Sequence, residues 1–328
     1  MGHLIEGKWT VGDLPSTADG RFVRKSSAFR NWITPDGSPG PSGQGGYPAQ
    51  AGRYHLYVSL ACPWAHRTLI FRRLKGLEAL VSLSVVNALM GADGWTFTQG
   101  ESVIPDPVMQ AQALHELYSL AAPDYTGRAT VPVLWDKQTR SIVSNESAEI
   151  IRMFNSAFDG LGAAPGDYYP QALRPEIDAL NAEIYAHLNN GVYRAGFAST
   201  QAAYEEAANA VFRQLDALEA RLSDQAYLLG TCLTEADWRL FTTLIRFDAV
   251  YVGHFKCNRR RILDYPQLWA YLRELYQMPG IADTVDIEQI KQHYYRSHES
   301  INPTRIVPVG PLLDLWAPHG REHIREAC

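Results

Sequence analysis

The first half of the chain shows an apolar pattern that changes from strand to helix and back. RYHLYVSL (53–60) and LVSLSVV (80–86) are nearly continuous apolar runs rich in β-branched and aromatic residues, which predicts two strands. Between them, residues 62–76 carry apolar side chains at helical spacing that stops at Gly76. Two strands joined by one helix form a parallel, right-handed βαβ unit. We therefore expect an α/β domain to begin here.

A hairpin and a second helix are predicted to complete this domain. Residues 87–127 are irregular apart from a short helical patch at 114–120. Residues 130–144 contain two apolar runs joined by a polar turn at 136–139, which predicts a β-hairpin. Residues 144–155 begin with polar capping residues and continue with an apolar helical face. The predicted order is βαβ followed by ββα.

The second half of the chain has a helical period throughout. Residues 156–175 are rich in Gly and Pro and predict a linker. Apolar residues then recur at helical spacing in four segments: 175–190, 201–222, 234–252 and 265–277. The tail from residue 297 shows no period, and we expect it to wrap the surface or a partner subunit. This half should be a helical bundle.

The N-terminal segment has a different composition from both halves. Residues 35–52 are so dense in Gly, Pro and Ser that we expect neither a helix nor a strand there. The predicted organisation is an N-terminal arm (1–52), an α/β domain (53–156), an all-helical domain (175–296) and a C-terminal tail (297–328).

The composition favours a globular protein and argues against nucleic-acid-binding and membrane-spanning proteins. A chain of 328 residues favours two domains at about 150 residues each, and 46% hydrophobic with 20% charged residues is typical of a packed globular protein. A net charge of -5 argues against a nucleic-acid partner. No apolar run approaches the ~20 residues of a membrane span, and the first residues lack the order of a signal peptide. We expect a cytoplasmic protein without a membrane segment.

Cysteine usage indicates one reactive thiol. Cys62, Cys232, Cys257 and Cys328 are too sparse for a disulfide scaffold and lack the spacing of a zinc site, so we expect no metal. Cys62 follows a strand and precedes a proline, the residue favoured at the first helical position. A helix N-terminus stabilises a thiolate and lowers a cysteine pKa from about 8.5 toward or below 7. Without a second cysteine three residues on, its chemistry must use an external thiol. The alternative is a buried, inert cysteine.

A proline interrupts the first strand of the predicted hairpin. Pro132 in TVPV (130–133) removes a donor from the strand, which indicates a sharp turn or a cis peptide. A cis bond would leave the backbone of Val131 able to pair with an extended peptide ligand. The alternative is an ordinary proline in an edge strand.

Two polar clusters begin predicted helices. In Asn145-Glu146-Ser147 the helix amides and the Ser147 hydroxyl suit a carboxylate, and Glu146 suits an ammonium group, so the pair fits the ends of an amino acid. The alternative is a simple helix cap. We interpret Thr234-Glu235-Ala236-Asp237 as a capping box.

Several motifs together resemble a known family. CPWAHR, TVPV and NES in the α/β part and TEAD in the helical part resemble glutathione transferases. The resemblance narrows to the Xi class, the glutathionyl-hydroquinone reductases, through GWTF, NNGVYRAGF, RFDAVYVGHFKCN, HYYRSH and INPT. It implies a thioredoxin-like N-terminal domain, an all-α C-terminal domain and a homodimer formed through the helical domains.

The resemblance also implies roles for individual residues. Cys62 matches the cysteine that takes glutathione as a mixed disulfide. Tyr193 and Tyr294 match the tyrosines that face the hydroquinone. The positions that match glutathione-binding residues are Trp95, Arg128, Val131, Glu146 and Ser147.

The expected enzyme cleaves glutathionyl-hydroquinones with glutathione as co-substrate. The thiolate attacks the thioether sulfur, hydroquinone leaves, and free glutathione resolves the mixed disulfide to give oxidised glutathione. One alternative is a broader glutathione-dependent thiol transferase or dehydroascorbate reductase, which needs no aromatic pocket. Another is a non-catalytic carrier of glutathione or aromatic ligands, or an interaction module.

Overall fold

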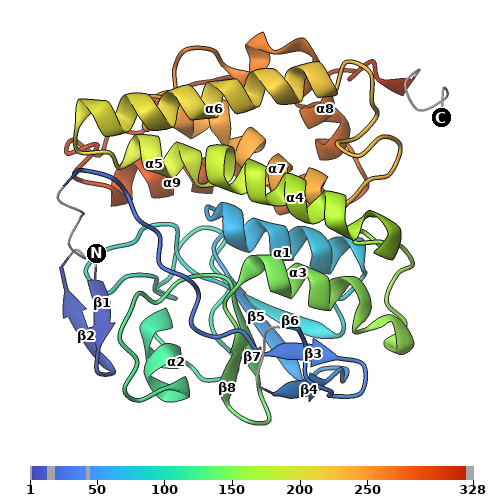
Figure 1. The fold of residues 1–328 in the computed structure, drawn as a ribbon. Helices are drawn as coiled ribbons and strands as arrows, with labels where there is room; N and C mark the ends of the chain where they lie inside the picture. Colours follow the sequence, from blue (N-terminus) through green and yellow to red (C-terminus); the bar gives the residue numbers. More distant parts are fainter. Residues whose placement is uncertain (1, 13–18, 42–44, 323–328) are drawn as a thin grey trace. The chain divides into compact units, whose positions relative to one another are not determined.

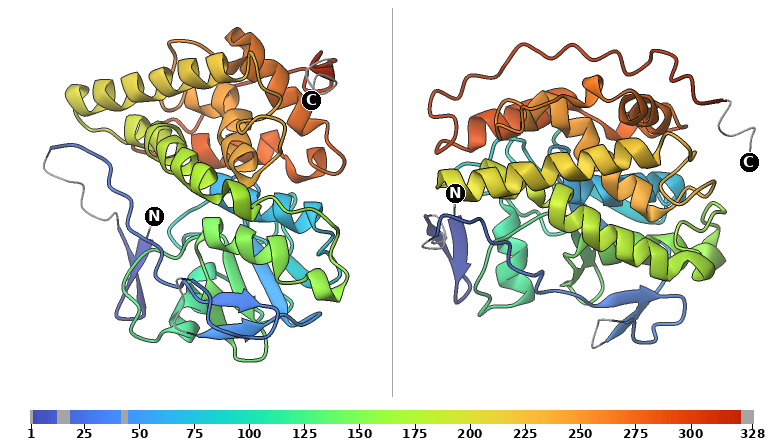
Figure 2. Two further views of the ribbon diagram at one scale, coloured as in Figure 1. Left: turned by 45° about the vertical axis from the view of Figure 1, so that its right-hand side comes forward. Right: turned by 45° about the horizontal axis from the view of Figure 1, so that its top comes forward.

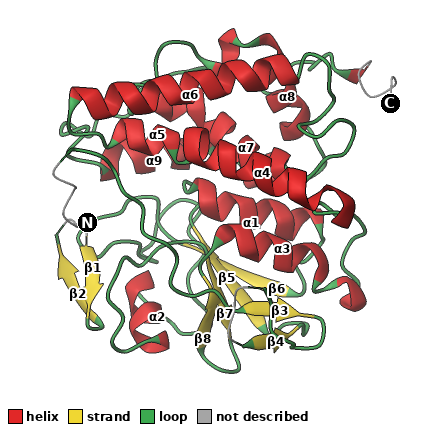
Figure 3. Cartoon of the chain, viewed as in Figure 1, coloured by secondary structure: helices red, strands yellow, loops and turns green. Residues whose placement is uncertain are grey.

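The computed structural model describes residues 2–12, 19–41 and 45–322 and divides the chain into two compact units. The first unit contains Met1–Pro15 and Lys25–Gly166, and the second contains Ser16–Arg24 and Asp167–Cys328. The segment 1–52 is therefore shared between the two units. Cys328 lies outside the described residues. Every strand in the described part of the chain belongs to the first unit (Figure 3).

The first unit is built around a four-stranded sheet with the order β6-β5-β7-β8 (Figure 1). The strand β5 (Tyr54–Val58) runs parallel to β6 (Val81–Val85) and antiparallel to β7 (Val133–Asp136), and β8 (Ser141–Ser144) pairs antiparallel with β7. All of β5 is buried, as its continuous apolar pattern predicts for a central strand. The predicted order, βαβ followed by ββα, is confirmed.

Two helices of this unit lie side by side, α1 (Pro63–Leu74) and α3 (Ser147–Ser156) (Figure 1). The end of α1 is a Schellman motif, in which Leu77 N donates to Arg72 O at 2.9 Å and Gly76 N donates to Arg73 O at 3.1 Å. Gly76 has φ +60°, a conformation that favours glycine, so it ends the helix where the sequence predicts. The predicted short helical patch is also present as α2 (Leu114–Ala121).

The N-terminal segment contains strands that the sequence did not predict. A hairpin is formed by β1 (Gly2–Ile5) and β2 (Lys8–Val11). The expectation of no strand in residues 35–52 is wrong, because β4 (Gly46–Pro48) pairs in parallel with β3 (Trp32–Thr34). Gly46 allows this pairing, since a Cβ there would lie 2.1 Å from a backbone oxygen of the preceding turn. A high glycine content therefore permits a close backbone contact here.

The second unit is helical (Figure 2). Its helices are α4 (Arg174–Ile184), α5 (Gly191–Gly196), α6 (Gln201–Arg221), α7 (Glu235–Arg246), α8 (Pro266–Tyr276) and α9 (Ile287–Ser297). The π-helical segments η3 (Tyr185–Asn189) and η4 (Phe247–Tyr251) extend α4 and α7. Short 3₁₀ turns are η1 (Asp159–Leu161) in the first unit, and η2 (Gln171–Leu173), η5 (Ile262–Asp264) and η6 (Ala282–Thr284) in the second. None of the helices in the described ranges is long and apolar enough to cross a membrane.

The helix α7 is the core of the second unit, because every one of its residues is buried. The predicted capping box at its start is confirmed. The Thr234 hydroxyl accepts from Ala236 N at 3.3 Å, and the Asp237 carboxylate accepts from Thr234 N at 2.8 Å. Asp237 also accepts a hydrogen bond from the Tyr271 hydroxyl of α8 at 2.7 Å, which links the two helices.

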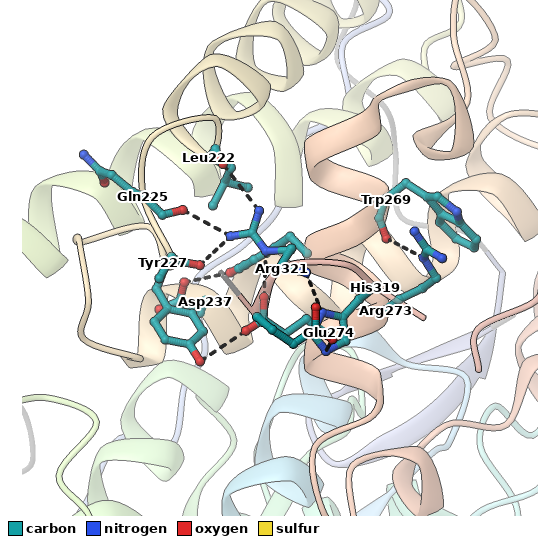
Figure 4. Close-up of polar contacts among 12 residues, drawn as sticks. Leu222, Gln225, Tyr227, Asp237, Trp269, Arg273, Glu274, His319 and Arg321 are labelled. Carbon is teal, nitrogen blue, oxygen red and sulfur yellow. Dashed lines mark hydrogen bonds and ion pairs between the residues drawn. The ribbon is translucent and has the colours of Figure 1, made fainter. Parts of the chain in front are cut away.

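The C-terminal tail runs along its own helical unit (Figure 2). Near its end, Arg321 is buried among residues of this unit (Figure 4). The Arg321 guanidinium forms an ion pair with Glu274 of α8 at 2.7 Å. It also donates to the backbone oxygens of Leu222, Gln225 and Ala226, at 3.4, 3.1 and 2.7 Å. A buried cation with this set of acceptors fixes the end of the described tail.

Candidate active site

The thiol of Cys62 lies at the start of α1. Cys62 is the N-cap residue, with φ -79° and ψ 122°, and Pro63 occupies the first turn as the sequence predicts. The Cys62 side chain is partly exposed and forms no disulfide with the other cysteines in the described part of the chain. The alternative of a buried, inert cysteine therefore fits Cys257, whose burial raises its pKa to about 12, better than it fits Cys62.

Two features act on the Cys62 thiol in opposite directions. The N-terminal end of α1 favours a negative charge on the sulfur. The carbonyl oxygen of Val131 lies 3.6 Å from Sγ and can accept the thiol proton, which favours the neutral form. The same contact brings together two of the residues singled out in the sequence, Cys62 and Val131.

The peptide bond between Val131 and Pro132 is cis, which confirms one of the two conformations that the sequence suggested. The loop is held by Tyr118 of α2, which the sequence analysis did not identify. Its hydroxyl donates to Thr130 O at 2.7 Å and accepts from Asn145 Nδ2 at 3.0 Å. One buried phenol therefore connects the loop before β7 with the loop before α3. No local pattern marks a tyrosine for this role.

The start of α3 carries Glu146 and Ser147. Glu146 is the N-cap residue, and its Oε1 accepts from Ala148 N at 3.0 Å. Its Oε2 accepts from the hydroxyl of Ser27 at 2.9 Å. Ser147 is buried in the first turn. Glu146 therefore caps α3, which is the structural alternative that the sequence offered. The Glu146 carboxylate and the first backbone amides of α3 also lie at the same end of the helix.

A pocket of about 100 Å³ in the first unit is lined by Trp95, Arg128 and Thr130 together with Trp9 of β2. Trp95 is buried and Arg128 is exposed. Trp9 stacks on His115 with the ring centroids 4.3 Å apart, and its indole Nε1 donates to Ala92 O at 2.9 Å. The structure therefore brings Trp95 and Arg128 to one pocket and adds a tryptophan that the sequence analysis missed.

The N-terminal hairpin is attached directly beside Arg128. Leu4 N donates to Gly127 O at 2.8 Å, and Gly127 N donates to Leu4 O at 2.9 Å. The hairpin is thus paired with the loop that carries Arg128.

The remaining two predicted residues, Tyr193 and Tyr294, meet within the second unit. Their hydroxyl oxygens are 2.5 Å apart, and the hydroxyl of Tyr251 lies 3.3 Å from that of Tyr294. Tyr294 is fully buried, and burial raises its pKa well above the usual value, so it remains a neutral phenol. The sequence analysis did not identify Tyr251 as a third member of this group.

Fold and site define a class of protein. A mixed α/β unit with a cysteine at a helix N-terminus beside a cis-proline loop, followed by an all-helical unit, is the arrangement of a glutathione transferase. The glutathione S-transferase N-terminal domain matches residues 61–157, and the C-terminal domain of the same family matches residues 201–274.

Individual relatives give a narrower assignment. The chain is 59% identical to glutathionyl-hydroquinone reductase YqjG of Escherichia coli, over 98% of this chain and 99% of that protein. It is 54% identical to glutathionyl-hydroquinone reductase PcpF of Sphingobium chlorophenolicum, over 96% and 98%.

Solved structures of similar proteins support the same assignment to the Xi class. The glutathione-bound structure of YqjG aligns with a TM-score of 0.91 at 57% identity, over 98% of this chain and 99% of that one. A Xi class GST from Natrialba magadii aligns with a TM-score of 0.91 at 48% identity, over 98% and 97%. The chain therefore belongs to the glutathione transferase family, in the Xi class of glutathionyl-hydroquinone reductases.

Proposed function

We propose that this protein cleaves glutathionyl-hydroquinones, using glutathione as co-substrate and Cys62 as the nucleophile. The observation that carries the proposal is the position of Cys62 at the N-terminus of α1, 3.6 Å from the carbonyl oxygen of Val131, in a chain of this family. A thiol at a helix N-terminus is suited to attack on sulfur.

The first step forms a mixed disulfide. The substrate reacts as its keto tautomer, in which the ring carbon that bears sulfur also carries a proton. The Cys62 thiolate attacks the glutathionyl sulfur, the sulfur–carbon bond breaks, and the electron pair moves onto a ring oxygen. The hydroquinone leaves as its anion and takes up a proton from solvent. The thiol sulfur is oxidised and the ring carbon is reduced, so the electrons balance.

The second step restores the enzyme. The thiolate of free glutathione attacks the glutathionyl sulfur of the mixed disulfide, which releases oxidised glutathione and the Cys62 thiolate. No second cysteine of the chain is needed.

Glutathione is assigned to the predicted residues of the first unit. The backbone of Val131 pairs with the cysteinyl part of the tripeptide, and the start of α3 with Glu146 and Ser147 holds its γ-glutamyl end. Trp95 and Arg128 line one pocket, which supports a role for these side chains in binding the glycine end of glutathione. The glycine end carries a carboxylate, and an arginine binds a carboxylate well.

Tyr193 and Tyr294 are assigned to the hydroquinone oxygens. A ring carbon is a poor leaving group, so the step needs hydrogen-bond donors where the negative charge develops. The pair of phenol hydroxyls, 2.5 Å apart, supports this role.

The experiment compares wild-type protein with Cys62→Ser, and uses Cys232→Ser, at an exposed cysteine, as the matched control. Formation of oxidised glutathione is measured with two substrates: a glutathionyl-hydroquinone, which also releases hydroquinone, and a glutathione mixed disulfide, which releases a thiol. Cys62→Ser should abolish turnover of both substrates but retain glutathione binding in calorimetry, and Cys232→Ser should remain active.

Two further measurements test the nucleophile itself. After reaction with a glutathionyl-hydroquinone in the absence of free glutathione, which stops at the first step, mass spectrometry should find one glutathione adduct, and peptide mapping should locate it on Cys62. The rate of Cys62 alkylation should rise with a midpoint below the ordinary thiol value of about 8.5. Full activity of Cys62→Ser would refute the mechanism. Turnover of the mixed disulfide alone would favour the broader thiol transferase, and glutathione binding without turnover of either substrate would favour a carrier.

The protein is also proposed to act in the cytosol as a homodimer formed through its helical unit. The reaction consumes reduced glutathione, which the cytosol maintains. Exposed apolar side chains on the tail of this unit support a partner surface, with Val309 98% and Leu312 95% exposed. Light scattering of wild-type protein and of Val309→Glu/Leu312→Glu tests the dimer, which the double substitution should weaken.

A further inference from the structure

Residues 19–24 pack on α5, which carries Tyr193, and on the turn between α5 and α6, although they are far from both in sequence. Ser199 N donates to Gly20 O at 3.0 Å, and the Thr200 hydroxyl donates to Asp19 O at 3.2 Å. The ring centroids of Phe22 and Phe197 are 5.3 Å apart. The segment is therefore part of the second unit and has a fixed position on it.

At the end of this segment, Arg24 lies over the ring of Tyr193. Its guanidinium carbon is 4.8 Å from the Tyr193 centroid and 5.4 Å from the Phe22 centroid. Its Nε donates to the side-chain oxygen of Asn190 at 2.9 Å, which holds the guanidinium above the ring. Arg24 is partly buried, and Tyr193 is 8% exposed.

A cation over a phenol ring has two effects. The ring quadrupole attracts the guanidinium, more strongly where water is excluded, so the ring is held in one orientation. The positive charge also draws electron density from the ring, which makes the phenolic hydroxyl a stronger hydrogen-bond donor. Both effects act at the hydroxyl that lies 2.5 Å from that of Tyr294.

We infer that Arg24 is a positioning residue for hydroquinone release: it fixes the Tyr193 ring, and its charge strengthens the hydrogen bond that this tyrosine donates to the departing ring oxygen. This inference rests on the proposed function. In the step concerned, the sulfur–sulfur bond to Cys62 forms, the carbon–sulfur bond breaks, and the electron pair resides on the hydroquinone oxygen until solvent protonates it. Arg24 acts through Tyr193 and does not touch the reacting atoms.

The neighbouring Arg21 provides a matched control. It belongs to the same segment, but its guanidinium forms ion pairs with Asp19 at 2.7 Å and Glu206 at 2.6 Å on the exposed surface. Removal of Arg21 perturbs the attachment of the segment without removing the charge over Tyr193. A difference between the two positions therefore separates the charge effect from the anchoring of the segment.

The test uses Arg24→Met, Arg24→Lys and Arg21→Met in the full-length protein. Methionine keeps an apolar side chain of moderate length, and lysine restores the charge. For a glutathionyl-hydroquinone, Arg24→Met should lower kcat about tenfold, Arg24→Lys should recover most of the loss, and Arg21→Met should match wild type. Reduction of a mixed disulfide has no ring oxygen to stabilise, so it should stay unchanged in all three.

Rescue by lysine distinguishes an electrostatic role from a packing role. Lysine restores the positive charge but not the planar guanidinium, so recovery of kcat in Arg24→Lys would assign the effect to the charge. Equal losses on both substrates, or a lysine variant as slow as the methionine variant, would overturn the inference.

The outcome also separates this inference from the proposed function. If wild-type protein fails to cleave the conjugate, the proposed function fails. If Tyr193→Phe slows cleavage and Arg24→Met does not, only the role of Arg24 fails. Thermal unfolding of each variant shows whether it is folded, and Arg24→Lys keeps the test valid if Arg24→Met is unstable.

Discussion

The hydroxyl oxygens of Tyr193 and Tyr294 lie 2.5 Å apart, although the residues are 101 positions apart in the chain. Each phenol has a single proton, so the hydrogen bond between them uses one proton and leaves the other for a further acceptor. Tyr251, 3.3 Å from Tyr294, adds a third phenol to the group. This arrangement can present one donor at a fixed position.

The first prediction concerns this pair. The double variant Tyr193→Phe/Tyr294→Phe should slow cleavage of a glutathionyl-hydroquinone by about 2 kcal/mol or more in activation free energy, the effect of losing one donor to a developing oxyanion. Steady-state kinetics with a mixed disulfide serves as the control, because its leaving group is a thiolate, and that rate should change little. Equal losses on both substrates would indicate that the tyrosines only support the fold.

The second prediction separates the two roles of Glu146. Glu146→Gln retains an oxygen that can cap Ala148 N, but it loses the charge proposed to hold the ammonium group of glutathione. It should raise the KM for glutathione by a factor that corresponds to a loss of about 1.5 to 3 kcal/mol in binding free energy. This is the range for a hydrogen bond to a charged group. Its thermal stability should remain close to that of wild type. If KM is unchanged while Glu146→Ala is destabilised, Glu146 is only a cap.

The third prediction concerns acid stability and His254. Burial lowers the pKa of His254 from 6.5 to about 4, and its Nε2 lies 3.1 Å from Nδ1 of His298. In the unfolded chain the imidazole of His254 binds a proton below pH 6.5, whereas in the folded protein it binds one only near pH 4. The free energy of unfolding therefore decreases as the pH falls from 6.5 to about 4.

At pH 5 the loss from His254 should be about 2 kcal/mol, from 1.5 pH units at 1.36 kcal/mol each. Urea unfolding at pH 7.5 and pH 5 measures the difference, which His254→Gln should reduce. The exposed His187→Gln is the control, and an unchanged pH dependence in His254→Gln would assign the acid sensitivity to other groups.

The fourth prediction concerns the buried ion pair between Arg321 and Glu274. Arg321→Met removes the cation from a buried carboxylate and should lower the free energy of unfolding by about 3 to 5 kcal/mol. Arg261→Met breaks an exposed ion pair with Asp264 and should cost far less stability, because solvent screens these two charges. Denaturant titration of both variants provides the comparison. Similar small losses in both would show that the tail contributes little to stability.

Local signals in the sequence predict the central part of the fold. The strand and helix periods, Gly76 at the end of α1, and the capping box of α7 depend on residues close together in the chain. For the same reason the position of Cys62 before Pro63 identifies a thiol at a helix start. The structure brings Cys62 together with Val131 and Trp95 together with Arg128, whereas Glu146 and Ser147 are neighbours in the sequence at the start of α3.

Other features depend on contacts across long sequence separations, and no local pattern encodes them. The strand β4 is three residues long in a segment rich in Gly and Pro, and it exists because β3 is available as a partner. Trp9 joins the pocket through a hairpin paired with Gly127, and Tyr118 links two loops through one hydroxyl.

The sequence by itself determined the order of elements, the position of Cys62 at the start of a helix, and the family. The tertiary structure decided which side chains surround the predicted residues, as with Tyr251 beside Tyr294 and Arg24 over Tyr193. The physical reason is that helix and strand periods report only whether a side chain is buried. A specific neighbour is selected by packing among segments that meet only when the chain has folded.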